Sequence, residues 1–168
     1  FLQGWFGRFD ESRSELHAIA SELLADVLAA RPQSRDRLRW FIRQIAGQRL
    51  WAEDLARIME DIVRALGPAD ELTPRALLSG SFSLRVMSKV DRATAFAEQA
   101  YRLAQAFPDE QREKLLISAS SQLGLCYTAA GRLLDAKPLL EFARDSAYRL
   151  NPPSEPSRAW VWYSTAAL

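Results

Sequence analysis

Residues 122–147 read QLGLCYTAAGRLLDAKPLLEFARDSA, and this stretch decides the fold. Before Gly131, apolar or small residues recur at helical spacing, namely Leu123, Tyr127 and Ala130. After it a second stripe follows, made of Ala136, Leu140, Ala143 and Ala147. Glycine accepts the left-handed backbone conformation that commonly ends a helix. The stretch therefore predicts two antiparallel helices that turn at Gly131 and approach closely at small residues, notably Gly124, Ala136 and Ala143.

The same residues resemble the tetratricopeptide repeat. Its motif has a Leu-Gly pair, an aromatic residue, a turn glycine, an acidic-Ala pair and a later alanine. Here these are Leu123-Gly124, Tyr127, Gly131, Asp135-Ala136 and Ala143. The resemblance implies an all-α, right-handed superhelix of antiparallel helical hairpins, whose first helices line a concave binding face.

Weaker copies of the turn segment Gly131–Ala136 occur at Gly7–Ser12, Gly47–Ala52 and Ser88–Ala93. Their last residues are Ser12, Ala52, Ala93 and Ala136, so the steps are 40, 41 and 43 residues. These steps exceed the usual tetratricopeptide period of about 34 residues. They resemble the elongated repeats of bacterial LuxR-like and signal-transduction ATPase transcription regulators. That resemblance implies a sensor module of a larger protein.

The repeat predicts one helical domain over residues 1–168 with no strand. Expected first helices span 35–46, 73–87, 109–130 and 155–168, and expected second helices span 10–31, 50–66, 91–107 and 133–150. Prolines separate the units, and Thr73 is an expected cap of its helix. Because Pro138 would interrupt the last second helix, that helix is expected to start nearer Asp135. Both ends are incomplete repeats, which indicates a fragment.

Composition fits an ordinary globular domain, with 48% hydrophobic and 26% charged residues. The net charge of +1 favours neither nucleic acid nor a membrane surface as a partner, and no apolar run is long enough to span a bilayer. Cys126 is the only cysteine, which favours a reducing, cytoplasmic location. Aromatic residues near the ends, Trp5, Phe6, Trp160 and Trp162, predict self-association.

Catalytic and metal-binding patterns are missing from the sequence. His17 is the only histidine, and no second ligand stands at metal-binding spacing. Cys126 is best explained as a buried small hydrophobe. No phosphate-binding loop or dinucleotide fingerprint occurs. The sequence thus predicts a protein that is not an enzyme and that has no cofactor and no metal.

The position of each residue relative to the repeat motif predicts which residues lie on the expected concave face. The resemblance implies a peptide- or ligand-binding set made of Arg37, Phe41, Gln44, Arg75, Phe82, Arg85, Ser121 and Thr128. Arginines and phenylalanines along one trough would suit an extended peptide, a protein or a small, anionic and partly apolar effector. The alternative is that the arginines are merely solvated and the phenylalanines pack between repeats.

Two other functions remain open. One is a general protein–protein interaction scaffold. The other is single-stranded RNA binding by a related helical repeat, which reads bases with polar side chains at fixed positions. Steps of 40 to 43 residues and the net charge of +1 count against RNA. The expectation is therefore a non-enzymatic ligand- or protein-binding sensor module of a bacterial transcription regulator.

Overall fold

The computed structural model describes residues 13–45 and 52–150, and all regular structure in these ranges is helical, as predicted. The helices there are α2 (Arg13–Leu28), α3 (Ser34–Ile45), α4 (Ala52–Leu66), α5 (Leu72–Val86), α6 (Val90–Gln105), α7 (Asp109–Ala129) and α8 (Leu133–Leu150). None of the helices in these ranges is long and apolar enough to cross a membrane.

Helix ends inside these ranges agree with the predicted bounds to within two residues, with one exception. Helix α2 ends at Leu28 rather than at residue 31, because Ala30 takes a positive φ of 52° and reverses the chain. The predicted helix over 155–168 lies outside the described residues. So do the first residues of the helix predicted over 10–31 and the aromatic residues Trp5, Phe6, Trp160 and Trp162.

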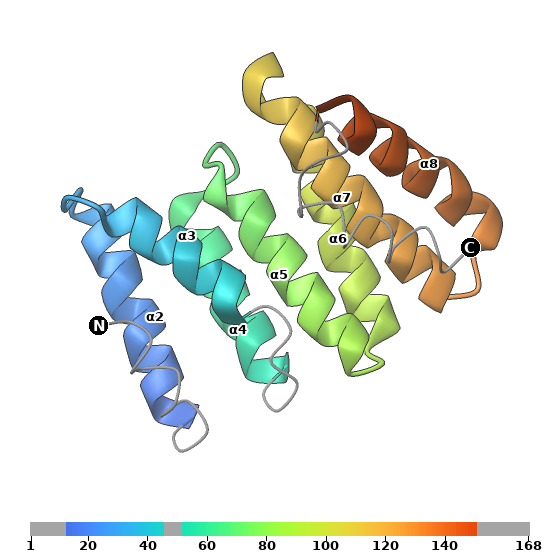
Figure 1. The fold of residues 1–168 in the computed structure, drawn as a ribbon. Helices are drawn as coiled ribbons and strands as arrows, with labels where there is room; N and C mark the ends of the chain where they lie inside the picture. Colours follow the sequence, from blue (N-terminus) through green and yellow to red (C-terminus); the bar gives the residue numbers. More distant parts are fainter. Residues whose placement is uncertain (1–12, 46–51, 151–168) are drawn as a thin grey trace.

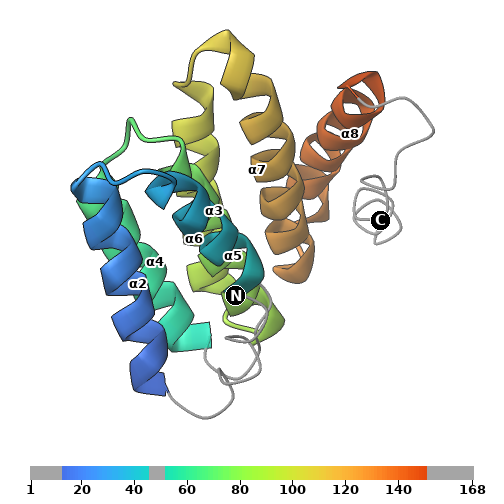
Figure 2. The ribbon, with the colours of Figure 1, turned by 60° about the vertical axis from the view of Figure 1, so that its left-hand side comes forward.

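Consecutive helices run antiparallel (Figures 1 and 2). They form two layers rather than one row, because α2 packs against α4 and α3 packs against α5. Helix α5 packs against both α3 and α7, so these three helices form one continuous face. On the other side, α4 and α6 do not pack closely against each other, and neither do α6 and α8. Helix α3 approaches α2 and α5 more closely than it approaches α4.

The core joins the apolar stripes of successive helices. One continuous cluster of buried side chains extends from Leu16 on α2 to Cys126 on α7. Its members include Leu38 and Phe41 of α3 and Leu84 of α5. Helix α3 buries one stripe, whereas α5 is buried on most of its circumference because it packs against α3, α4, α6 and α7.

Gly124 brings α7 and α8 together. A Cβ atom at this position would lie 2.6 Å from Cγ of Leu140, closer than side-chain atoms normally approach. Ala136 and Ala143 of α8 are buried, as predicted. Small residues thus allow the two helices to pack at short distance.

The later start expected for the last helix is wrong. Helix α8 begins at Leu133 and contains Pro138. A proline at this position leaves the carbonyl of Leu134, four residues earlier, without its helical N–H partner. Because Leu134 is 90% exposed, water can reach this end of the helix, and the proline is tolerated there.

The turns after α5 and α7 have the same backbone geometry. Ser88 and Gly131 have φ values of 59° and 74°. In each turn the following amide donates back to a helix carbonyl: Lys89 N to Leu84 O at 2.9 Å, and Arg132 N to Tyr127 O at 2.8 Å. This is the Schellman C-cap, in which glycine is preferred. The same cap follows α2, where Ala30 has a φ of 52° and Arg31 N donates to Asp26 O at 3.0 Å. The turns after α5 and α7 therefore agree with the pairing of Ser88 with Gly131 but are not specific to it.

Replacing Ser88 by glycine should stabilise the protein by about 0.5–1 kcal/mol. The change relieves about 1–2 kcal/mol of left-handed strain, partly offset by the greater freedom of glycine in the unfolded chain. Urea denaturation monitored by circular dichroism measures the difference. The same change at Ser118, which lies inside α7, should be destabilising because glycine is a poor helix former. Equal effects at both positions would contradict the explanation.

Candidate functional site

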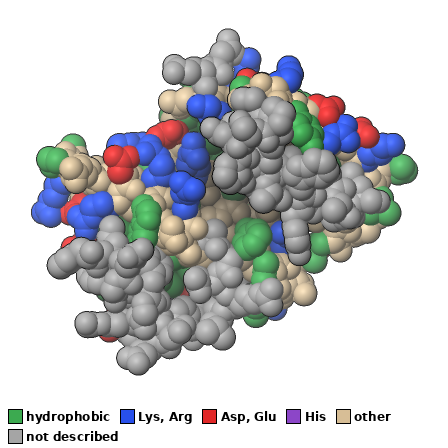
Figure 3. Space-filling model, in the orientation of Figure 1, with side chains coloured by type: hydrophobic (Ala, Val, Ile, Leu, Met, Phe, Trp, Pro, Cys, Tyr) green, Lys and Arg blue, Asp and Glu red, His purple; other side chains and the backbone are tan. Residues whose placement is uncertain are grey.

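A groove of about 570 Å³ lies between α3, α5 and α7. It is lined by Arg39, Ile42 and Arg43 of α3, by Arg75, Leu78, Ser79 and Phe82 of α5, and by Leu115, Ser118 and Gln122 of α7. Figure 3 shows Arg and Lys side chains gathered on this face over α3 and α5. These three helices are the expected first helices, and their shared face carries a groove whose α3 and α5 walls are cationic.

Helical spacing explains how each helix presents its groove residues. Residues three and four apart lie on one face of a helix. Arg39 and Arg43 are one such pair, and Arg75, Leu78 and Phe82 form the corresponding row on α5. The neighbouring stripe of α3, which includes Leu38, Phe41 and Ile45, is buried in the core. The groove residues thus stand beside the core stripe, at the edge of the packed interior.

Three predicted site residues on α5 meet at the groove. Arg75 and Phe82 line it. The guanidinium of Arg85 lies over the ring of Phe82, 5.4 Å from its centroid. Arg85 therefore supports the ring and is not itself a lining residue.

Phe41 is not a groove residue. Its side chain is only 2% exposed and belongs to the core cluster. The predicted exposure of this ring is wrong, because Phe41 lies on the buried stripe of α3.

The other predicted residues also lie away from the groove lining. Arg37 is exposed and donates to Oδ2 of Asp26 on α2 at 3.2 Å, and Gln44 is exposed. Ser121 is buried, and the hydroxyl of Thr128 donates to the carbonyl of Gly124 at 2.9 Å. Instead, the structure places Arg39, Arg43 and Gln122 in the groove. Their sequence signal is a polar residue directly beside an apolar stripe.

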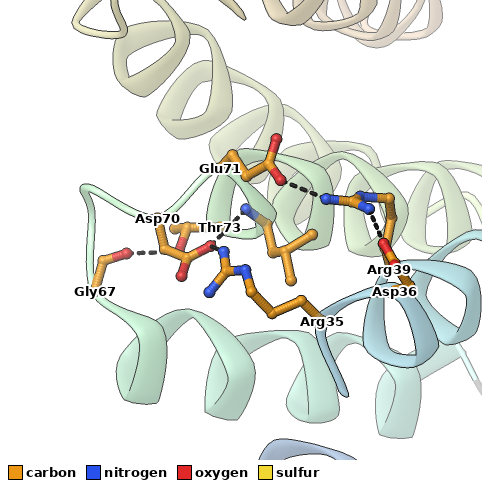
Figure 4. Close-up of polar contacts among 8 residues, drawn as sticks. Arg35, Asp36, Arg39, Gly67, Asp70, Glu71 and Thr73 are labelled. Carbon is orange, nitrogen blue, oxygen red and sulfur yellow. Dashed lines mark hydrogen bonds and ion pairs between the residues drawn. The ribbon is translucent and has the colours of Figure 1, made fainter. Parts of the chain in front are cut away.

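Ion pairs connect α3 to the start of α5 (Figure 4). Arg35 donates to Oδ1 of Asp70 at 2.7 Å, and Asp70 also accepts from the amide of Leu72 at 2.9 Å. The Asp70 carboxylate thus accepts from the first amide of α5, whose N-cap position is Glu71, whereas Thr73, the predicted cap, lies within the helix and donates to the carbonyl of Gly67 at 2.6 Å. These contacts fix one end of the groove.

A second connection lies closer to the groove. Arg39 donates to the carboxylates of both Asp36 and Glu71 (Figure 4). The Asp36 side chain is 75% exposed, whereas that of Glu71 is 23% exposed. Solvent screens exposed pairs strongly, so Glu71 is the more effective counter-ion of Arg39.

Arg75 is the least compensated cation of the groove. Its side chain is half-buried, and its buried Nε has no hydrogen-bond partner. Burial lowers the pKa of Arg75; nearby Glu71 opposes this, while Arg39 and Arg43 lower it further. Arg43 forms no ion pair with any residue in the described ranges. The groove therefore holds positive charge that an anionic ligand would stabilise.

The α7 wall of the groove is polar and uncharged. Gln122 donates from Nε2 to the hydroxyl of Ser81 at 3.1 Å, and Ser81 donates to the carbonyl of Ala93 at 2.7 Å. The Cys126 sulfur lies 3.4 Å from the same hydroxyl. Burial raises the pKa of the Cys126 thiol, and the residue packs in the core cluster as a small hydrophobe.

A second hollow of about 610 Å³ lies among α6, α7 and α8. The guanidinium of Arg132 lies over the Tyr127 ring at 3.9 Å, and it also pairs with Asp135 at 2.9 Å. The Tyr127 hydroxyl donates to Glu98 at 2.9 Å. Because these polar groups satisfy one another, this hollow offers less to a ligand than the groove does.

In residues 13–45 and 52–150, no group of His, Cys, Asp and Glu is placed to hold a metal ion. Compared with known proteins, the chain matches no family model, no curated protein and no solved structure. The groove residues are therefore the best guide to function. Their cationic wall, apolar floor and neutral polar edge suit a ligand that is both acidic and apolar.

Proposed function

We propose that the chain is a non-enzymatic binding module that holds an acidic, partly apolar peptide segment in the groove between α3, α5 and α7. The observation that carries this proposal is that one face of α5 presents two groups to the groove: Arg75, a half-buried cation whose Nε has no hydrogen-bond partner, and the aromatic ring of Phe82 about two helical turns further on. A ligand carboxylate would bind Arg75, and an apolar side chain would cover Phe82.

The larger setting follows from the repeat. We propose a right-handed, tetratricopeptide-like superhelix that serves as the sensor of a bacterial LuxR-like transcription regulator. The matched turns at Ser88 and Gly131 support a structural repeat of 43 residues. The direct contacts of α5 with α3 and α7 support a concave face on the side of the first helices. A general protein-interaction scaffold would use the same groove.

A peptide library displayed on beads, screened against the whole chain, tests the binding function. Enriched peptides should combine Asp or Glu with Leu or Phe. Replacing Arg75 by methionine should weaken their binding about tenfold or more, since a hydrogen bond to a charged group contributes about 1.5–3 kcal/mol. Methionine keeps the apolar packing of the arginine stem. Fluorescence polarisation of a labelled enriched peptide measures the affinity.

The matched control is Arg64→Met on α4, whose guanidinium is exposed and pairs with Asp61 at 2.8 Å within the same helix. This variant should bind the peptide like the wild type. The proposal fails if no peptide is enriched, or if Arg75→Met and Arg64→Met bind equally. Enrichment of basic peptides, or displacement by a single-stranded RNA oligonucleotide at lower concentration than by peptide, would also reject it.

A further inference from the structure

Glu71 is the only carboxylate that the described residues place against the groove cations with little exposure to solvent. It stands directly before α5 and accepts a hydrogen bond from Arg39 of α3 (Figure 4). Its charge also raises the pKa of Arg75, against the lowering that burial causes there. One acidic side chain thus hydrogen-bonds Arg39 and attracts Arg75 electrostatically.

The charges of the groove can be assigned in pairs. Arg39 is neutralised by Glu71, with additional help from the more exposed Asp36. Arg43 is exposed, so solvent screens its charge. Arg75 remains as the one half-buried cation in the groove lining without a hydrogen-bonded carboxylate among the described residues. In the less solvated part of the groove, the positive charges of the arginines therefore exceed the negative charges of the carboxylates by one.

We infer that Glu71 is a specificity-determining residue that makes the groove select a single carboxylate over a dianion such as a phosphate group. The carboxylate is held by Arg75, with Arg43 at the open side. This inference rests on the proposed function, because it specifies which acidic group the same groove accepts.

The physical reason is charge balance at low solvent exposure. One carboxylate cancels the uncompensated charge of Arg75. A dianion would leave one negative charge close to Glu71, and like charges repel more strongly where water is partly excluded. Removal of the Glu71 charge leaves Arg39 paired, among the described residues, only with the exposed carboxylate of Asp36, so Arg39 becomes available as a second partner and the groove then fits a dianion.

Three small probes of similar shape test this at pH 8: benzoate, phenyl phosphate and neutral benzamide. Each is titrated into the full chain, and nuclear magnetic resonance follows the arginine Nε–Hε signals. In the wild type, benzoate should shift the Arg75 and Arg43 signals at lower concentration than either other probe. In Glu71→Gln, affinity for phenyl phosphate relative to benzoate should rise about tenfold, because removal of one like charge from a partly solvated site relieves the repulsion of the second phosphate charge.

The matched control is Glu60→Gln on α4, which removes an exposed carboxylate that pairs with Arg92 at 3.5 Å outside the groove. It should leave the probe ratio unchanged. Thermal denaturation checks that both variants are folded, and the wild-type probe order tests the inference even if Glu71→Gln does not fold. The inference is overturned if phenyl phosphate binds the wild type more tightly than benzoate, or if a folded Glu71→Gln keeps the wild-type ratio.

The outcomes separate this inference from the proposed function. Peptide binding that depends on Arg75, together with an unchanged probe ratio in Glu71→Gln, would reject the role of Glu71 and keep the binding module. Benzoate binding at Arg75 without any enriched peptide would reject the peptide-binding module and keep an anion site that Glu71 controls.

Discussion

Replacing Phe41 by alanine should lower the free energy of unfolding by about 3–5 kcal/mol, the cost of removing a fully packed phenylalanine. The ring is 2% exposed and belongs to the core that joins α2 to α7. Loss of the ring leaves a cavity in α3, whose close neighbours among the described helices are α2 and α5. Urea denaturation monitored by circular dichroism gives the change as a lower midpoint at an unchanged slope.

Phe82 provides the matched comparison, because it is the same residue type on the groove surface. Its ring is only half-buried, so Phe82→Ala should cost much less stability and should mainly weaken peptide binding. A Phe41→Ala protein that keeps its stability but no longer binds the enriched peptide would contradict this assignment. Phe41 would then be a binding residue.

Much of the fold could be predicted because its signals are local. Gly131 marks a turn by its backbone freedom alone, and Ser88 could be paired with it by counting along the repeat. Apolar stripes at three- and four-residue spacing gave helix ends that agree to within two residues almost throughout the described ranges. Such signals depend on neighbours within a few positions, which a single sequence contains.

The groove could be predicted as a location but not residue by residue. One α-helical residue turns the side-chain direction by about 100°, so an error of two positions moves a residue to the opposite face. On α3 the sequence predicted Arg37 as a groove residue, but Arg39 lines the groove instead. On α7 it predicted Ser121, but the groove residue is its neighbour Gln122. Because the repeats step by 40, 41 and 43 residues, counting from Gly124 gave the correct face on α5 but not on α3.

Contacts between distant residues had no sequence signal at all. The Arg39–Glu71 and Arg35–Asp70 pairs join residues that are 32 and 35 positions apart. Each of these residues by itself resembles an ordinary solvated charge. Only the packing of α3 beside α5 distinguishes Glu71, which pairs with the groove residue Arg39, from exposed carboxylates such as Glu60.

Replacing Gly124 by valine should lower the free energy of unfolding by about 2–3 kcal/mol, despite the better helix propensity of valine. The new Cβ would stand 2.6 Å from Leu140 Cγ and 3.4 Å from the carbonyl of Ala136. Forcing extra atoms into a packed interface typically costs about 1–3 kcal/mol, and a β-branched side chain cannot turn away. The denaturation midpoint measures this cost.

A double-mutant cycle with Leu140→Ala identifies the cause. If the contact between α7 and α8 is responsible, the loss of unfolding free energy in the double variant should be smaller, by about 1–2 kcal/mol, than the sum of the losses in the two single variants. Gly131→Ala serves as the control, because a Cβ there meets nothing within 4 Å and the cost comes from its φ of 74°. Leu140→Ala should not rescue that variant. Additive effects of Gly124→Val and Leu140→Ala would mean that the two helices do not owe their close approach to this glycine.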